Sequence, residues 1–329
     1  MAAIGNTALT LADWAKGQDP DGKVAKVVEI LDQTNEILID MLWMEGNLPT
    51  GHKTTIRTGL PSATWRLLNY GVSKGKSTKA QVVDACGMLE TYSEIDKALA
   101  DLNGNTAEFR LSEDKAFLEG MNQQMAEALF YASQATNPER ITGLAPRYSS
   151  LSAGNATNII DAGGSGSDNT SLWLVVWGDN TCHGIFPKGS KAGLAHSDKG
   201  EQTLLDGNTP AGQYQGYRTH YKWDAGLTLR DWRYVVRVCN IDVSDLAGSS
   251  PANLINFLIR ATHKIPNLGM GRPAIYCNRA VSTWFDIQAL NKTNVQLKMD
   301  EFDGKPRTTF RGIPIRTVDA ILNTESRVT

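Results

Sequence analysis

The chain has 329 residues, with 33 lysines and arginines against 35 aspartates and glutamates, so its net charge is −2, and 41% of its residues are hydrophobic. This composition excludes a disordered or collagen-like chain and is typical of a folded protein with room for about two domains. The near-neutral charge argues against a protein whose whole surface neutralises nucleic-acid phosphate, because such proteins usually carry a strong basic excess.

The sequence shows no targeting or membrane signal. Its longest purely apolar stretch is residues 172–177, and the N-terminus lacks a basic start followed by an apolar block. We therefore expect neither a signal peptide nor a membrane span. The four cysteines lie far apart without a CxxC pair, which indicates reduced thiols instead of a disulfide framework. These cysteines are Cys86, Cys182, Cys239 and Cys277.

The first elements in the chain are a helix and a basic arm. Apolar residues at three- and four-residue spacing predict an amphipathic helix over residues 23–45. The segment 46–83 has six basic residues and no acidic one. Within it, residues 54–58 and 64–68 are strand-like, which predicts a hairpin with a turn of about four residues. An isolated hairpin is marginal in water, so we expect this arm to lie on something else.

The remaining elements predict an α+β fold, with a helix-rich first third followed by a sheet-rich remainder. A helix is predicted over residues 79–102, and a longer one over residues 112–136, where Ser112 as N-cap precedes acidic residues and Asn137-Pro138 stops the helix. Strands are expected at residues 172–177, 229–238, 273–277 and 313–318, further helices from Ser250 and Asn278, and a polar, loop-rich excursion at 189–217.

Motifs of nucleotide chemistry are incomplete. Gly75-Lys76-Ser77 resembles the end of a phosphate-binding loop, but the preceding Gly71 is one residue too close and no buried strand comes before it. Residues 269–274 fit the letters of a dinucleotide fingerprint, but they lie between a helix and a strand in the wrong order. We interpret both as ordinary loops or turns.

No catalytic or metal-binding constellation is evident either. The five histidines lack HxxxH or HExxH spacing, and there is no G-x-S-x-G elbow. We expect no enzyme activity, no cofactor and no metal. An enzyme site assembled from distant segments, around Cys182 or His183, stays open as one alternative.

The basic arm supplies the candidate contact residues. The predicted hairpin is too small to have its own core, so we expect an aromatic side chain on it, such as Trp65, to lie in an interface. We expect the contact to use the arm's charged residues together with this tryptophan: Lys53, Arg57, Trp65, Arg66, Lys74 and Lys76. Basic and aromatic groups also suit base stacking, so a second alternative is a nucleic-acid-binding module that uses residues 53–79.

The order of these elements resembles the major capsid proteins of tailed bacteriophages with the Hong Kong 97-type fold, among them the coats of short-tailed Bordetella-type phages. The residues that carry the resemblance are 30–38 leading to Glu45-Gly46-Asn47, the helix over 113–135, Ile141-Thr142-Gly143-Leu144, and Phe310-Arg311-Gly312-Ile313-Pro314-Ile315.

The resemblance implies five parts of the chain. They are an N-terminal arm (1–50), an extended hairpin loop (51–83), a peripheral domain (84–160) with its spine helix at 112–136, an axial domain (161–299) and a C-terminal strand that returns to the peripheral domain (300–329).

It also implies a structural function, in which copies form the pentamers and hexamers of an icosahedral head around double-stranded DNA. The implied partners are other copies of the chain, a cement or decoration protein, portal and scaffolding proteins during assembly, and packaged DNA on the inner face, with no membrane. The implied location is the virion, after assembly in the host bacterial cytoplasm.

Overall fold

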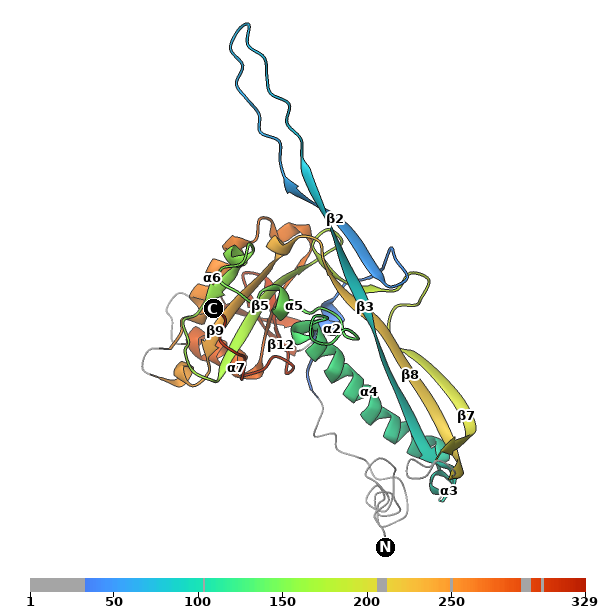
Figure 1. Ribbon diagram of the computed structural model, residues 1–329. Coiled ribbons are helices and arrows are strands. Elements are labelled where there is room, and N and C mark those ends of the chain that lie inside the picture. Colours follow the sequence, from blue (N-terminus) through green and yellow to red (C-terminus); the bar gives the residue numbers. More distant parts are fainter. Residues whose placement is uncertain (1–32, 103, 206–211, 249–250, 291–296, 303–304) are drawn as a thin grey trace.

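The computed structural model describes residues 33–102, 104–205, 212–248, 251–290, 297–302 and 305–329. Figure 1 shows a body of strands and helices, a long helix that runs from this body along a ribbon of strands, and a hairpin that projects away at the opposite end of the ribbon. The mixed content agrees with the predicted α+β class.

The centre of the body is the strand β5, Asn169–Trp177, in which every residue is buried. Its side chains alternate between two hydrophobic clusters, with Trp173, Val175 and Trp177 in one and Leu172, Leu174 and Val176 in the other. The predicted strand at 172–177 is therefore confirmed. β5 pairs antiparallel with β9, Val235–Asp242, and with β10, Arg272–Cys277. Next to these strands, β4, Ile159–Asp161, runs parallel to β9, and β13, Ile313–Thr317, runs parallel to β10.

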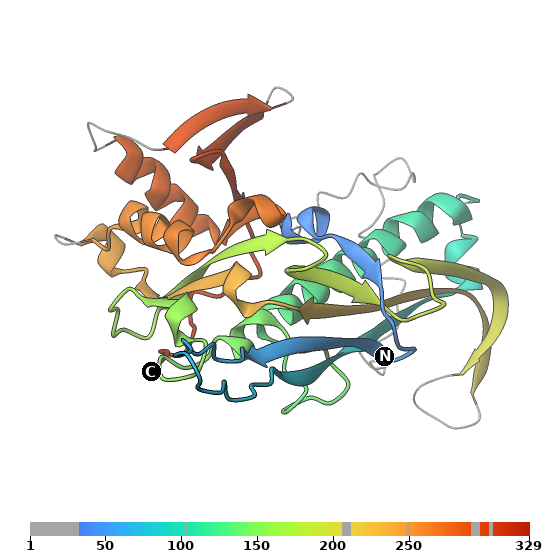
Figure 2. The ribbon, with the colours of Figure 1, turned by 90° about the horizontal axis from the view of Figure 1, so that it is seen from above.

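Two helices contribute to the second cluster: α6, Leu254–Lys264, and α7, Arg279–Leu290. The side-chain oxygen of Asn278 accepts a hydrogen bond from the N–H of Val281 at 2.9 Å, so this residue caps α7 as predicted. Beyond α7, β11, Leu297–Phe302, and β12, Lys305–Phe310, form an antiparallel pair that stands off from the body (Figure 2).

The long helix α4, Thr106–Tyr131, contributes to the first cluster through Leu129 and Phe130. It begins and ends earlier than the predicted 112–136. The helix starts before Ser112 because Phe109 is buried with Ile95 and Leu99, which stabilises an additional N-terminal part of the helix. The chain turns to an extended conformation at Ala132, with ψ of 144°, which ends the helix before Asn137-Pro138. The short helices α3, Lys97–Ala100, and α5, Leu144–Arg147, flank α4 in the chain.

Two predictions are wrong in the ribbon of strands that lies along α4. The predicted helix at 79–102 is the strand β3, Thr78–Asp96, and most of the predicted loop at 189–217 is the hairpin of β7, Ala195–Leu205, and β8, Gln213–Leu229. β8 pairs with β3 from Gly226 to Gly216 and with β7 on its other edge. Backbone pairing to two partners outweighs the weak helical spacing of β3.

The predicted helix at 23–45 is mostly wrong within the described residues, and its first ten residues lie outside them. Only α2, Ile37–Asp40, is helical, and Met41 is already extended. β1, Trp43–Glu45, then pairs in parallel with β6, Cys182–Phe186, which joins it to the body. The predicted strand at 229–238 begins later, at Val235, after a 3-10 turn. The 3-10 turns are Ala156–Asn158, Trp232–Tyr234, Asp245–Ala247 and Leu268–Met270.

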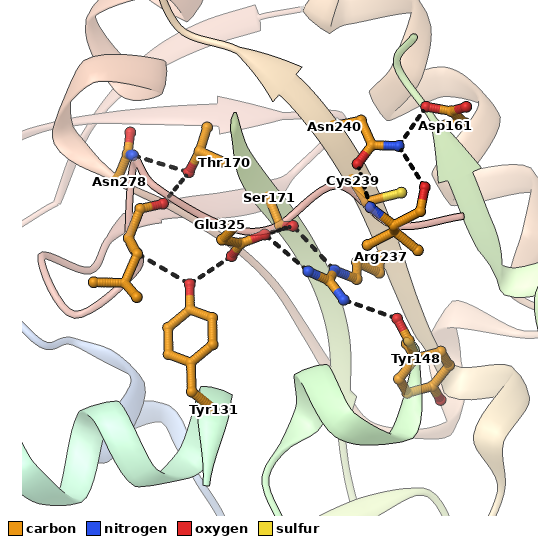
Figure 3. Close-up of polar contacts among 12 residues, drawn as sticks. Tyr131, Tyr148, Asp161, Thr170, Ser171, Arg237, Cys239, Asn240, Asn278 and Glu325 are labelled. Atoms are coloured by element: carbon orange, nitrogen blue, oxygen red, sulfur yellow. Dashed lines mark hydrogen bonds and ion pairs between the residues drawn. The ribbon is translucent and has the colours of Figure 1, made fainter. Parts of the chain in front are cut away.

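A buried polar network ties the C-terminal segment to the body (Figure 3). Arg237 on β9 forms an ion pair with Glu325 at 2.8 Å and donates to the carbonyl of Tyr148 at 2.8 Å. Glu325 also accepts a hydrogen bond from Tyr131 of α4 at 2.5 Å and one from Ser171 of β5. Three distant elements, β9, α4 and β5, therefore contact the carboxylate of Glu325 and satisfy its charge inside the protein.

Candidate assembly surface

The arm consists of β2, Gly51–Gly59, the first part of β3, and the connecting loop at residues 60–77. The two strands pair antiparallel from Gly51 opposite Ala85 to Gly59 opposite Thr78, and the arm extends well beyond the body (Figure 1). The predicted second strand at 64–68 is wrong. Residues 64–67 form no strand, and a turn follows them, with Tyr70 N–H bonded to the Leu67 carbonyl around Asn69, whose φ is 68°.

All six predicted contact residues lie on this arm and are exposed. Lys53 and Arg57 are on β2, and the other four are on the loop. Trp65 has 101% relative exposure, so no part of the described chain covers it. Within the described residues, none of the five basic side chains takes part in an ion pair. These groups therefore lie one after another along the projecting arm and do not form a single cluster. The basic residues concerned are Lys53, Arg57, Arg66, Lys74 and Lys76.

The loop is also apolar, a property that the predicted hairpin does not include. Six large hydrophobic side chains are between 53% and 86% exposed or, for Trp65, fully exposed. Contiguous apolar exposure of this kind marks a surface that is covered by another molecule. The signal was present in the sequence, but assigning residues 64–68 to a strand hid it. The six residues are Leu60, Trp65, Leu67, Leu68, Tyr70 and Val72.

The base of the arm is held by a buried carboxylate. Asp84 on β3 forms an ion pair with Arg147 at 2.8 Å and accepts a hydrogen bond from the hydroxyl of Thr228 on β8 at 2.7 Å. Gly51 lies so close to β3 that a Cβ there would be 2.1 Å from the carbonyl oxygen of Asp84. A glycine is required at this close approach, and the arm therefore leaves the body from a fixed base.

Two histidines pack next to this base. His52 and His183 stack edge to face with ring centres 5.8 Å apart, and Arg230 donates to His52 Nε2 at 3.0 Å. Burial lowers the pKa of His183 to about 4, with the Arg230 charge acting in the same direction. Burial followed by Arg230 also lowers the pKa of His52. Both rings are therefore neutral at pH 7, and His52 Nε2 is free to accept the guanidinium hydrogen bond.

In the described structure, Cys182 lacks the properties of a catalytic nucleophile. Burial raises the pKa of the Cys182 thiol to about 12, which is the wrong direction for a catalytic thiolate. All four cysteines are free thiols. In the described parts of the chain, no group of three or more metal-ligating side chains is placed to hold an ion. Gly75-Lys76-Ser77 lies in the arm loop, with neither a strand before it nor a helix after it.

A groove of about 840 Å³ runs beside the arm, between β2 and the loops at residues 180 and 230–233. Its charged lining is mostly basic: Lys53 and Arg57 come from the arm, and Arg230 and Arg233 from the body. Its single lining acid, Asp231, is paired with Arg233 at 2.7 Å. No helix in the described residues has both the length and the apolar character needed to cross a bilayer.

Comparison with known proteins places these features in context. Residues 19–329 match the sequence model of a family described as Major capsid protein GP7. The chain is 38% identical to a chain in the cryo-EM structure of bacteriophage Epsilon15, with a TM-score of 0.80 and coverage of 100% of both chains. A chain of the bacteriophage JBD30 capsid matches at 7% identity and a TM-score of 0.48, covering 89% of this chain and 93% of that one. No curated protein matches.

Proposed function

The chain belongs to the major capsid protein GP7 family, and from this premise we propose that its copies assemble into the pentamers and hexamers of an icosahedral phage head that encloses double-stranded DNA. Members of this family are structural components of the virion capsid and not enzymes. The assembly state, the enclosed DNA and assembly in the host bacterial cytoplasm are parts of the proposal.

The observation that carries the proposal is the arm. It projects from the body with exposed basic and apolar side chains that the described chain leaves uncovered (Figure 1). In water such a surface is unfavourable, and covering it with another molecule recovers the hydrophobic contribution, about 25 cal/mol per Å² of apolar area. A contact of one patch with a different patch on the next copy closes into rings when the rotation permits, as the five- and six-fold axes of a head require.

The proposal also divides the chain into parts. Residues 51–83 form the extended loop, and α4 serves as the spine helix of a peripheral domain. The axial domain is built around β5, β9 and β10. β8 pairs with β3, and β7 pairs with β8, which favours moving these two strands from the axial domain to the peripheral one. The C-terminal segment returns to the peripheral domain, a proposal supported by the hydrogen bond between Tyr131 of α4 and Glu325. A decoration protein, portal and scaffolding proteins are the further proposed partners.

The experiment reverses two charges on the arm. Arg57→Glu with Arg66→Glu is expected to give few shells while the subunit stays folded, because both side chains are exposed and unpaired within the described chain. Lys115→Glu with Lys199→Glu makes the same change of charge on exposed residues outside the arm and is the matched control. Sedimentation velocity counts particles, and circular dichroism reports folding.

Shell yield equal to wild type from the arm variant would contradict the proposal. The alternative of a nucleic-acid-binding module makes a different prediction for the same samples. It requires the isolated subunit to bind DNA tightly, with an affinity that falls steeply as salt rises.

A further inference from the structure

β2 is an edge strand with one free side. It pairs with β3 alone in the described sheet, so its opposite edge carries backbone groups that no described strand satisfies. Such an edge can accept another strand, because the unpaired N–H and C=O groups are already arranged for a ladder.

The blocked part of this edge is defined by two local contacts. Gly51 exchanges backbone hydrogen bonds with Leu48, at 3.0 and 3.3 Å. Lys53 donates its N–H to the side-chain oxygen of Asn47 at 2.7 Å and accepts from the side-chain nitrogen of Asn47 at 2.8 Å. The backbone groups of Gly51 and Lys53 therefore point away from β3, and their own neighbours cover them.

The open part follows from the alternation of an antiparallel ladder. Every second residue of β2 turns its N–H and C=O to the same side, and the regular pairing with β3 continues as far as Arg57 opposite Lys79. Thr55 and Arg57 therefore present their backbone groups on the same side as Lys53. No hydrogen bond to another described segment covers these groups, and both residues line the groove of about 840 Å³.

The charges around this open edge select the occupant. Of the four basic side chains that line the groove, Arg233 is paired with Asp231 and Arg230 with Asp179. Lys53 and Arg57 are the two that have no acidic partner among the described residues. The arm segment 46–83 holds six of the 33 basic residues and none of the 35 acids, so the rest of the chain has 27 basic against 35 acidic residues, a net charge of −8. A second copy of the chain therefore presents the complementary charge outside its own arm.

We propose that the open edge of β2 at Thr55 and Arg57 receives an extended acidic segment of a second copy of this chain, which adds to the arm as a β-strand. The segment's backbone pairs with these two residues, and its carboxylates face Lys53 and Arg57. This inference rests on the proposed assembly and adds the backbone contact by which one copy engages another.

Amide hydrogen exchange tests the inference on the full-length chain, in shells and in unassembled subunits prepared without any other protein. The amides of Thr55 and Arg57 are expected to exchange roughly 100-fold or more slowly in shells than in subunits, because a new ladder protects them. Lys53, bonded to Asn47, and Ile56, which faces β3, are the internal references and should differ less between the two samples.

A pair of variants gives a second readout. Thr55→Pro removes the outward N–H and is tolerated at a free edge, whereas Thr55→Val keeps it. We expect shell yield to fall at least about tenfold for T55P and to stay at the wild-type level for T55V. Circular dichroism checks that T55P subunits are folded.

Two results would overturn the inference. Shells with rapidly exchanging Thr55 and Arg57 amides would leave the proposed function standing and remove this contact. Slow exchange of both amides already in the free subunit would show that the chain covers its own edge. If the full-length chain forms no shells, either alone or with a scaffolding protein, the proposed function fails first.

Discussion

Arg237 and Glu325 form an ion pair at 2.8 Å in which each side chain is only 5% exposed. The two residues are far apart in sequence, and their contact holds the C-terminal segment against β5 and α4 (Figure 3). Because the pair is buried, loss of one charge leaves the other without a partner in a low-dielectric site.

The first prediction concerns this pair. Glu325→Gln should lower the free energy of unfolding by about 3 kcal/mol or more, because Arg237 keeps its charge and loses its counterion. Glu127→Gln, on the exposed side of α4, is the control and should change it by less than about 0.5 kcal/mol. Urea denaturation of the unassembled subunit measures both. Similar stability of E325Q and E127Q would contradict the account of the network.

A second prediction tests the close approach at the base of the arm. Gly51→Ala should destabilise the subunit by about 2 kcal/mol, because the new Cβ would meet the Asp84 carbonyl at 2.1 Å. Gly71→Ala places its Cβ in open space, with nothing within 4 Å, and is the matched control. Thermal unfolding midpoints compare them. Equal midpoints would show that the base has room that the structure does not indicate.

Acidification should destabilise the subunit through His183. Its pKa is about 4 in the folded protein against 6.5 in its unperturbed state, so the unfolded state binds the proton more readily. The stability from the neutral ring is fully present above about pH 6.5 and is lost as the pH falls toward 4, up to roughly 3 kcal/mol. The lowered pKa of His52 acts in the same direction.

The variant His183→Asn separates this effect from general acid denaturation. Asn can still donate to the Gly178 carbonyl, the partner of His183 Nδ1 at 3.3 Å, and it does not titrate. Stability of H183N should therefore fall less than that of wild type between pH 6.5 and 4, measured by urea denaturation at each pH. Parallel loss in the two proteins would rule out His183 as the source.

A fourth prediction concerns Trp65. The side chain is fully exposed in the subunit, so Trp65→Ala should leave the free energy of unfolding within about 0.5 kcal/mol of wild type. If a second copy buries it, each contact loses about 2 kcal/mol, which raises the protein concentration needed for assembly by roughly 30-fold. Leu111→Ala, 59% exposed on α4, controls for loss of an apolar surface group. An unchanged assembly threshold for W65A would remove Trp65 from the contact.

The last prediction concerns the blocked edge. Asn47→Ala removes both hydrogen bonds to the Lys53 backbone and should lower the free energy of unfolding by about 1 kcal/mol, since both bonds are partly in water. It should also accelerate exchange of the Lys53 amide in the free subunit. Asn47→Asp keeps the acceptor for that amide and should preserve its protection. Equal exchange in N47A and wild type would contradict the capping contact.

The sequence predicted those elements whose local signal agrees with their final environment. The apolar run at 172–177 is a strand buried on both faces, and Asn278 caps α7 through its side chain. The arm was foreseen because residues 46–83 lack acids, and its six candidate residues are exposed on it.

The failures have a common physical cause. β3 and β7 have few buried side chains and are held by backbone pairing to β8 and, for β3, to β2, so their side chains carry little strand periodicity. The sequence also predicts the second strand of the arm at the wrong place. This strand pairs with β2 across the connection at residues 60–77, so its position depends on the pairing register and not on a local turn. The groove beside β2 could not be foreseen, since it joins Lys53 to Arg230 across distant parts of the chain.

The central claim is that the arm of one copy contacts another copy within a closed shell. Cryo-electron microscopy of particles assembled from the purified chain tests it most directly. The account predicts closed icosahedral shells in which residues 60–77 of each subunit, Trp65 included, lie against a neighbouring subunit. Shells whose arms extend freely into solvent, or a chain that stays monomeric at high concentration both alone and with a scaffolding protein, would contradict it.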